Sequence, residues 1–180
     1  MSKIGKKPVF IPDGVDVKID GNLITANGPK GTLQREFPDS IKVEIENGKA
    51  MISPAGEKAG QSEIWGLWRA LFSNMVIGVS KGFEKILDFT GIGFKAAVSG
   101  DLLELNLGFS HPVKIKTPEG ITFKTEKGVI IISGADKEKV GHIAALIRAK
   151  RPPEPYKGSG IKYREEVIKR KAGKKAVATG

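Results

Sequence analysis

Residues 38–43 read PDSIKV, and residues 118–123, about 80 positions later, read PEGITF. The likeness continues downstream, where Glu46, Gly48, Ile52, Ser53 and Ala55 correspond to Glu126, Gly128, Ile132, Ser133 and Ala135. Upstream, GNLI at residues 21–24 matches GDLL at residues 100–103. Similarity at a fixed spacing is the mark of an internal repeat. The sequence therefore predicts a duplicated domain, with a first copy at residues 1–82 and a second at residues 83–180.

The repeated unit begins with strands. Three runs of the first copy alternate in polarity, with positions on one face at Val15, Val17 and Ile19, then Leu33, Arg35 and Phe37, then Ile41, Val43 and Ile45. Such alternation is typical of half-buried strands. Asp20-Gly21 and Asn47-Gly48 lie between these runs and favour the positive φ that tight hairpins require.

Each copy then has one helix. In the first, an apolar stripe at helical spacing runs through Ile64, Leu67, Trp68, Leu71, Phe72, Met75 and Val76, with Trp65 beside it, and the helix is expected to end at Gly78. In the second, the stripe is Val140, Ile143, Ala144 and Ile147, with Asp136 as N-cap and Pro152-Pro153 after the end. The predicted class is α+β, with two tandem copies, each an antiparallel sheet with one packed helix, followed by a basic C-terminal extension.

Composition excludes several kinds of chemistry. The 180 residues include no cysteine and only two histidines, so disulfides, thiolate metal sites and a cysteine nucleophile are absent. We expect neither a cofactor nor a metal. The longest apolar stretch, residues 64–79, is interrupted by Arg69, Ser73 and Asn74, and no apolar segment follows the basic start. The sequence therefore predicts a soluble, cytoplasmic protein without a transit peptide.

Positive charge is concentrated at the end of the chain. The formal net charge is +10, and from Arg148 onward there are 11 basic residues and 3 acidic ones. The basic residues are interleaved with Tyr156, Ile161 and Tyr163 and with Gly158 and Gly160. Lysine and arginine displace counterions from a polyanion, and tyrosines stack on unpaired bases. Because no helix carries a pattern for reading base edges in a major groove, a structured RNA is favoured over a DNA operator.

The candidate RNA-binding residues have different expected roles. Those for phosphates are Lys150, Arg151, Lys157, Lys162 and Arg164. Tyr156 and Tyr163 are expected to stack or donate hydrogen bonds, and Gly158 and Gly160 to permit a close backbone approach. Lys169, Arg170, Lys171, Lys174 and Lys175 are expected to form a tail that orders only on RNA, since so charged a segment has little apolar surface. Weaker candidates are Lys3, Lys6 and Lys7 of a basic N-terminal arm, and His111.

Other readings stay open at this point. One is a polybasic membrane-surface module or a non-specific polyanion binder, in which the tail alone acts. Another is a hydrolase that uses His111 as a general base, although no nucleophile accompanies it in the pattern. His142 lies opposite the apolar stripe of its helix and is expected to face solvent or a partner. Gly28-Pro29-Lys30-Gly31 and Gly91-Ile92-Gly93 lack the spacing of a phosphate loop.

Residues 153–163, PEPYKGSGIKY, resemble the C-terminal signature of the large-subunit ribosomal protein six family of bacteria, "L six". The resemblance runs nearly end to end. Further motifs are SKIGKKP at 2–8, IPDGV at 11–15, GPKG at 28–31, NMV at 74–76 with Gly78-Val79, GIGFK at 91–95, LGFSHP at 107–112, GADK at 134–137 and Ile147-Arg148. Two departures concern Ser159, where the family usually has lysine, and Trp65 with Leu67, where it typically has histidine and threonine.

The resemblance implies a function. It implies a structural, non-enzymatic protein of two tandem α+β copies that binds large-subunit (23S-type) ribosomal RNA through the second copy and the C-terminal segment. It also implies a position near the base of the acidic stalk and the sarcin–ricin region, beside the factor-binding site. The partners so implied are ribosomal RNA and neighbouring large-subunit proteins, with translation factors close by. Carried over by motif, Tyr156, Lys157, Gly158, Gly160, Lys162 and Tyr163 would contact the RNA.

Overall fold

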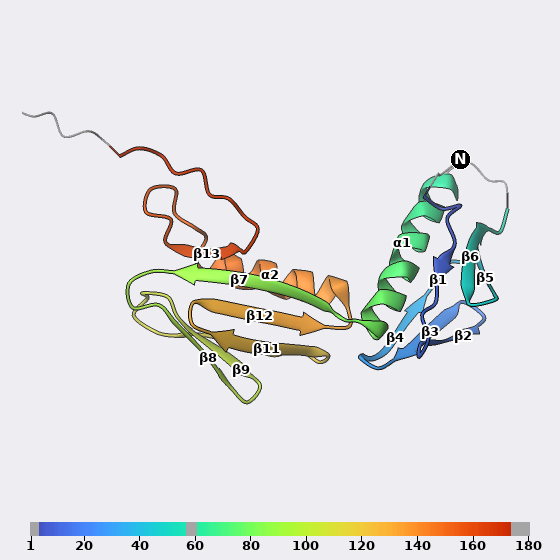
Figure 1. Cartoon of the computed structure of the whole chain (residues 1–180), viewed down its shortest axis with the longest axis horizontal. Helices are drawn as coiled ribbons and strands as arrows, with labels where there is room; N and C mark the ends of the chain where they lie inside the picture. The colour runs from blue at the N-terminus through green and yellow to red at the C-terminus, as the bar shows by residue number, and fades with distance from the viewer. Residues whose placement is uncertain (1–3, 57–60, 174–180) are drawn as a thin grey trace, which may run out of the picture. The chain divides into compact units, whose positions relative to one another are not determined.

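The computed structural model describes residues 4–56 and 61–173. It divides into two units (Figure 1). Unit 1 is Met1–Phe83 with Gly134–Glu138, and unit 2 is Glu84–Ser133 with Lys139–Gly180. The candidate RNA-binding residues Lys3, Lys174 and Lys175 lie outside the described residues.

Unit 1 contains two three-stranded antiparallel sheets and one helix. Its elements are β1 (Val9–Phe10), β2 (Asp16–Asp20), β3 (Leu23–Gly28), β4 (Gly31–Glu36), β5 (Ile41–Glu46), β6 (Lys49–Pro54) and α1 (Gln61–Ser80). The sheet orders are β1-β6-β5 and β2-β3-β4. The three runs that alternate in polarity thus coincide with β2, β4 and β5, which confirms them as strands.

The core of unit 1 forms where α1 packs on both sheets. Phe72, Val76 and Val79 of α1 are buried together with Ile24 and Ala26 of β3 and Ala50 and Ile52 of β6. The Phe37 ring lies 4.5 Å from the Trp68 ring and meets Phe72 edge-on. Aromatic pairs in this tilted arrangement add to the free energy gained by burying their area.

The predicted stripe of α1 is wrong at its N-terminal end. Ile64 and Leu67 are 39% and 55% exposed, and Trp65 instead packs against the core. The reason is a hydrogen bond: the Trp65 Nε1–H donates to the Ile52 carbonyl at 2.5 Å. The indole ring can therefore pack against the core without leaving its N–H donor unpaired. A Cβ on Gly5 would lie 2.5 Å from this ring.

The end of α1 also differs from the expectation. The helix continues past Gly78 to Ser80. Gly78 is not a terminator; a Cβ there would lie 2.0 Å from the Ala135 carbonyl oxygen. Glycine is therefore required at this position for close backbone approach rather than for ending the helix.

Unit 2 repeats the pattern and adds a strand. Its elements are β7 (Phe83–Thr90), β8 (Lys95–Ser99), β9 (Leu102–Asn106), β10 (Val113–Lys116), β11 (Ile121–Glu126), β12 (Val129–Gly134), α2 (Lys137–Lys150) and β13 (Gly160–Tyr163). The sheet orders are β10-β9-β8 and β11-β12-β7-β13. The predicted α+β class and the repeat are confirmed, and the strands of each copy fall into two sheets.

The second helix agrees with the sequence pattern. Val140, Ile143, Ala144 and Ile147 are its buried residues, and α2 lies along the four-stranded sheet (Figure 1). The Glu138 backbone N–H donates to Asp136 Oδ1 at 2.8 Å, which confirms the predicted N-cap. His142 is exposed, as its position opposite the stripe indicates.

Turn glycines occur at matching places in the two copies. Gly21 and Gly48 have φ of 60° and 72°, and their repeat partners Gly100 and Gly128 have 58° and 76°. Asn47, at φ 50°, precedes Gly48 in the same hairpin. Positive φ at both central residues is the geometry of the tightest hairpin turns. The repeat therefore preserves turn geometry as well as sequence.

We predict that Gly160→Ala lowers the free energy of unfolding by about 2 kcal/mol or more, because a Cβ would combine backbone strain with a steric clash. Gly160 has φ +134°, and its Cβ would lie 2.5 Å from the Pro152 carbonyl oxygen. Gly141→Ala in α2, where no atom lies within 4 Å of the added Cβ, is the control and should stabilise by up to about 1 kcal/mol. Urea unfolding measures both; equal midpoints would contradict the steric argument.

Candidate nucleic-acid interface

The basic segment after α2 forms a loop that backbone hydrogen bonds fix at both ends, rather than a free tail. Ile161 N–H donates to the Arg151 carbonyl at 2.8 Å, and Glu154 N–H donates to the Ser159 carbonyl at 2.8 Å. Gly158 N–H closes a turn onto the Glu154 carbonyl at 3.0 Å. Residues 151–161 therefore run from the end of α2 to the sheet, with both ends fixed.

β13 attaches this loop to the four-stranded sheet. It pairs antiparallel with β7, with Gly160 opposite Thr90 and Tyr163 opposite Leu87. Ile161 is completely buried, and Thr90 Oγ1 donates to the Gly158 carbonyl at 3.1 Å. Since β7 is the neighbour of β12, the loop is anchored through backbone pairing to the core of unit 2.

Four predicted contact residues are exposed on or beside this loop. Lys150, Arg151, Tyr156 and Lys157 are exposed, and Tyr156 is 55% accessible. In the described part of the chain, none of the three cations forms an ion pair with a carboxylate. Their charges are therefore available to a polyanion. We call these four residues the loop cluster.

Arg151 is held by an aromatic side chain. Its guanidinium carbon lies 5.1 Å from the centre of the Phe109 ring. Arginine over an aromatic face keeps a fixed orientation while its N–H groups remain open to a ligand. Phe109 did not enter the candidate set, because nothing in its own neighbourhood signals a partner more than 40 residues away.

Three candidate RNA-binding residues in and after β13 already contact other side chains or strands of the protein. Arg164 Nη2 lies 3.3 Å from Asp88 Oδ1, so part of its charge is compensated. Tyr163 is half-buried, with Lys85 and Arg148 within 6 Å of its ring centre. Lys162 is half-buried opposite Asp88 in the strand register. Lys162 and Tyr163 are therefore less accessible than the loop cluster, whereas Arg164 is exposed but partly compensated by Asp88.

Gly158 and Gly160 each have a structural reason to be glycine. The sequence alone does not distinguish this reason from a role in RNA binding. Gly160 has no room for a Cβ beside Pro152 and Pro153. Gly158 has φ +73°, and the Arg170 side chain lies about 3 Å from where its Cβ would be. Any larger residue at either position strains the loop itself, so a valine at Gly158 would not test close approach of RNA alone.

The start of the predicted tail folds back on the loop. Lys171 N–H donates to the Pro155 carbonyl at 2.9 Å, and Lys169, Arg170 and Lys171 are exposed. Lys171 therefore has one backbone partner in the loop, and the expectation that these three residues order only on RNA stays a prediction.

The weaker candidates lie elsewhere. Lys6 and Lys7 are exposed in unit 1, where Arg69 Nε donates to the Lys7 carbonyl at 3.2 Å. His111 is exposed in unit 2, with Ser110 Oγ 3.5 Å from its Nδ1. Within the part of the chain that the structure describes, His111 forms no hydrogen bond or ion pair with the loop cluster.

An ion pair stabilises the end of α2 beside the loop. Arg148 donates from Nε and Nη2 to the two oxygens of Glu166, at 2.9 and 2.5 Å, and Glu166 also accepts from the Tyr163 N–H at 3.2 Å. The hydrogen bonds from Arg148 lower the pKa of Glu166 below its ordinary value, and Glu166 raises the pKa of Arg148. Arg148 is thereby turned toward the protein.

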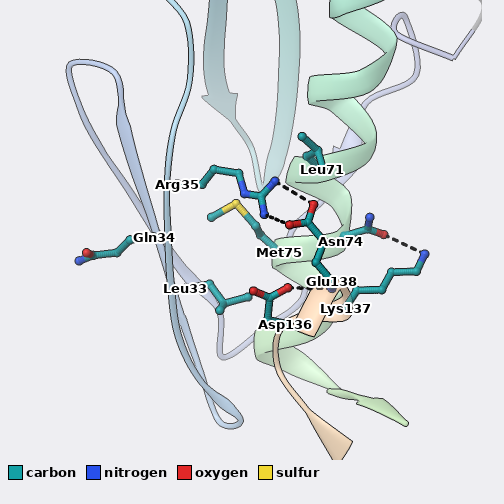
Figure 2. A pocket seen from close by; sticks show the side chains of 9 residues that line it. All are labelled: Leu33, Gln34, Arg35, Leu71, Asn74, Met75, Asp136, Lys137 and Glu138. Atoms are coloured by element: carbon teal, nitrogen blue, oxygen red, sulfur yellow. Dashed lines mark hydrogen bonds and ion pairs between the residues drawn. The ribbon is translucent and has the colours of Figure 1, made fainter. Parts of the chain in front are cut away.

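Unit 1 contains a small pocket of about 40 Å³ with apolar and charged lining residues (Figure 2). Arg35 donates to both oxygens of Glu138, at 3.2 and 2.8 Å, and Lys137 Nζ lies 3.4 Å from Asn74 Oδ1. The volume holds a few water molecules, and each charged side chain that lines it already has a hydrogen-bond partner in the protein. This pocket is a structural contact and not a ligand site.

The two units differ in charge. Unit 1 has 12 basic and 11 acidic residues, whereas unit 2 has 18 and 9. Across the described residues, no cluster of metal-ligating side chains occurs. Neither helix in that part of the chain is long and apolar enough to cross a membrane. The arrangement suits the binding of a polyanion by unit 2.

Comparison with known proteins gives one consistent result. The family model described as "Ribosomal protein L6" matches residues 11–82 and 90–164. Proteins named "Large ribosomal subunit protein uL6" from Nitratiruptor sp. and Wolinella succinogenes are 53% and 52% identical, over 176 and 174 residues. The matches cover 98% and 97% of this chain, and 99% and 98% of the two relatives. A relative of the same name from Fusobacterium nucleatum is 49% identical over 177 residues.

We predict that the Arg148–Glu166 ion pair makes the free energy of unfolding depend on pH in the acid range. Because the pKa of Glu166 is lowered on folding, its contribution is present above the ordinary value of 4.5 and is lost as pH falls through the folded value. Both side chains are about a quarter to a third exposed, so the contribution is at most about 1 kcal/mol.

Urea unfolding at pH 6 and pH 3.5 tests this pair. Glu166→Gln should lower the free energy of unfolding at pH 6 by up to about 1 kcal/mol and by less at pH 3.5. Glu165→Gln, at the exposed neighbouring position, is the control. The same loss at both pH values would show that charge pairing is not the cause.

Proposed function

This chain belongs to the ribosomal protein L6 family and is a structural constituent of the large ribosomal subunit, and from that premise we propose that unit 2 binds large-subunit ribosomal RNA. The single observation that supports this most is the loop cluster. It presents three cations that have no carboxylate partner among the described residues, together with one exposed tyrosine, at the end of α2 and on a loop fixed at both ends. A preorganised loop loses little conformational entropy when it binds.

The proposed mechanism is docking without catalysis. Lys150, Arg151 and Lys157 replace counterions on phosphates, and Tyr156 stacks on a base or donates to a phosphate oxygen. Lys162, Arg164 and Tyr163 contribute secondary contacts, since protein groups already engage them. Lys169, Arg170, Lys171, Lys174 and Lys175 extend the basic surface along the RNA, and Lys6, Lys7, Lys3 and His111 are weaker candidates.

The proposal also covers organisation and place. We take residues 1–82 and 83–180 as the two duplicated copies, with RNA binding in the second. The resemblance of the C-terminal signature supports a position near the base of the acidic stalk and the factor-binding region of a cytoplasmic ribosome. Neighbouring large-subunit proteins are the other proposed partners, and no cofactor or enzymatic step is required.

Sedimentation of ribosomes from cells that express the chain tests the function as a whole. We expect the chain to remain with the large subunit after a wash at about 0.5 M salt, because several simultaneous phosphate contacts survive there. Release into the supernatant would contradict the proposal. Binding to vesicles of anionic lipid would then decide whether the polybasic alternative applies.

A single-residue test addresses the loop cluster. We predict that Lys157→Ala weakens binding to full-length large-subunit ribosomal RNA and makes the slope of log affinity against log salt shallower by about one unit or slightly less. Lys18→Ala, an exposed lysine of β2 in unit 1, is the control and should leave the slope unchanged. Filter binding at a series of salt concentrations measures it; an unchanged slope for Lys157→Ala removes this residue from the interface.

A further inference from the structure

A cleft of about 540 Å³ opens beside the loop cluster, within unit 2. One wall is the loop that follows β7, with Ile92 and Phe94, and the other is the loop after α2, with Arg151, Glu154, Lys157 and Ser159. The volume lies in the range of sites for small organic groups. Phosphate neutralisation by the loop cluster does not require such a cleft.

The β7 side of the cleft is apolar. Ile92 is fully exposed, at 101% of its reference area, between two glycines. Phe94 is half-buried, and its ring packs so closely on Gly91 that a Cβ there would lie 2.7 Å from it. A flat apolar group that entered the cleft would cover Ile92 and meet the Phe94 ring, which removes apolar surface from water.

The opposite side is charged, with both signs. Arg151 and Lys157 are cations, whereas Glu154 is a carboxylate whose Oε2 accepts from Ser159 Oγ at 3.1 Å. A carboxylate repels phosphate and can only accept hydrogen bonds. A ligand that fits this wall therefore presents N–H donors to Glu154 and negative charge to Arg151 and Lys157.

We propose that this cleft binds one unpaired base of the ribosomal RNA that carries an exocyclic amino group, which is adenine, cytosine or guanine. The base covers Ile92 and Phe94, its amino group donates to Glu154, and the phosphates that flank it contact Arg151 and Lys157. This assignment rests on the proposed RNA interface and adds a base-specific contact to it.

The serine at 159 contributes to this specificity. A longer cationic side chain at this position would pair with the carboxylate, whereas the serine hydroxyl donates to one of its oxygens only. Ser159 leaves one carboxylate oxygen of Glu154 without a hydrogen bond from the described residues. The other oxygen is therefore available to accept from the amino group of a base.

Chemical probing of the complex with full-length large-subunit ribosomal RNA tests the proposal. Dimethyl sulfate reports adenine and cytosine, kethoxal reports guanine, and a carbodiimide reports uracil, each at its Watson–Crick edge. We expect the wild-type chain to protect one unpaired A, C or G that becomes at least threefold more reactive with Ile92→Ala at saturating protein. Glu154→Ala should expose the same base, because it removes the acceptor for the amino group.

The matched control is Val167→Ala, which truncates another highly exposed apolar side chain of unit 2 outside the cleft and should leave every protection unchanged. Both apolar truncations remove exposed atoms, so neither is expected to alter folding. Ile92→Ala should also raise the apparent Kd about threefold or more while leaving the salt slope unchanged, since no charge is removed.

The outcomes separate this proposal from the RNA interface itself. Identical protections with Ile92→Ala and Val167→Ala, while Lys157→Ala still makes the salt slope shallower, would overturn the base site and leave the interface intact. Exposure of a uracil alone would overturn the assignment of an amino-bearing base. A wild-type chain that protects no nucleotide would overturn both proposals.

Discussion

The pairing of β13 with β7 is the constraint on which the proposed interface depends. Four residues, Gly160–Tyr163, join the sheet, and the complete burial of Ile161 fixes them there. Without this strand, the segment after Pro152-Pro153 would be a charged chain with little apolar surface to order it. With it, the loop cluster has fixed ends, and its cations are positioned before any ligand arrives.

The sequence predicts those parts of the fold whose signal is local and repeated. Alternation, turn glycines and the stripe of α2 all follow from neighbouring residues, and the duplication doubles each signal. β13 was missed because its one apolar anchor, Ile161, lies among glycines and charges, and its partner β7 is about 70 residues away. The phase of α1 was wrong at Trp65 because the acceptor for its indole N–H, the Ile52 carbonyl, belongs to another element.

The number of charges in the candidate site could be counted from the sequence. Which of these charges are paired within the protein, and which are free to bind a polyanion, could not be predicted. Arg148, Arg164 and Lys157 look alike in a basic run, yet Arg148 is bound by Glu166 and Arg164 lies against Asp88. Asp88 is distant in sequence, so only the strand register reveals that pair. Gly160 shows the same limit. Pro152 and Pro153 leave no room for a Cβ at this position, and a ligand that approached the backbone closely would also require glycine, so the sequence alone does not separate the two causes.

Comparison of the two copies separates what the fold provides from what binding requires. β1-β6-β5 in unit 1 corresponds to β7-β12-β11 in unit 2, and β13 is the strand that the second copy adds beside β7. In the described residues of unit 1, β1 remains the edge of its sheet, and that unit is nearly balanced in charge. The shared architecture therefore does not by itself specify RNA binding. The proposed specificity arises where the extension after α2 uses the free edge of β7, since this one pairing places cations, a carboxylate and the apolar β7 loop around one cleft.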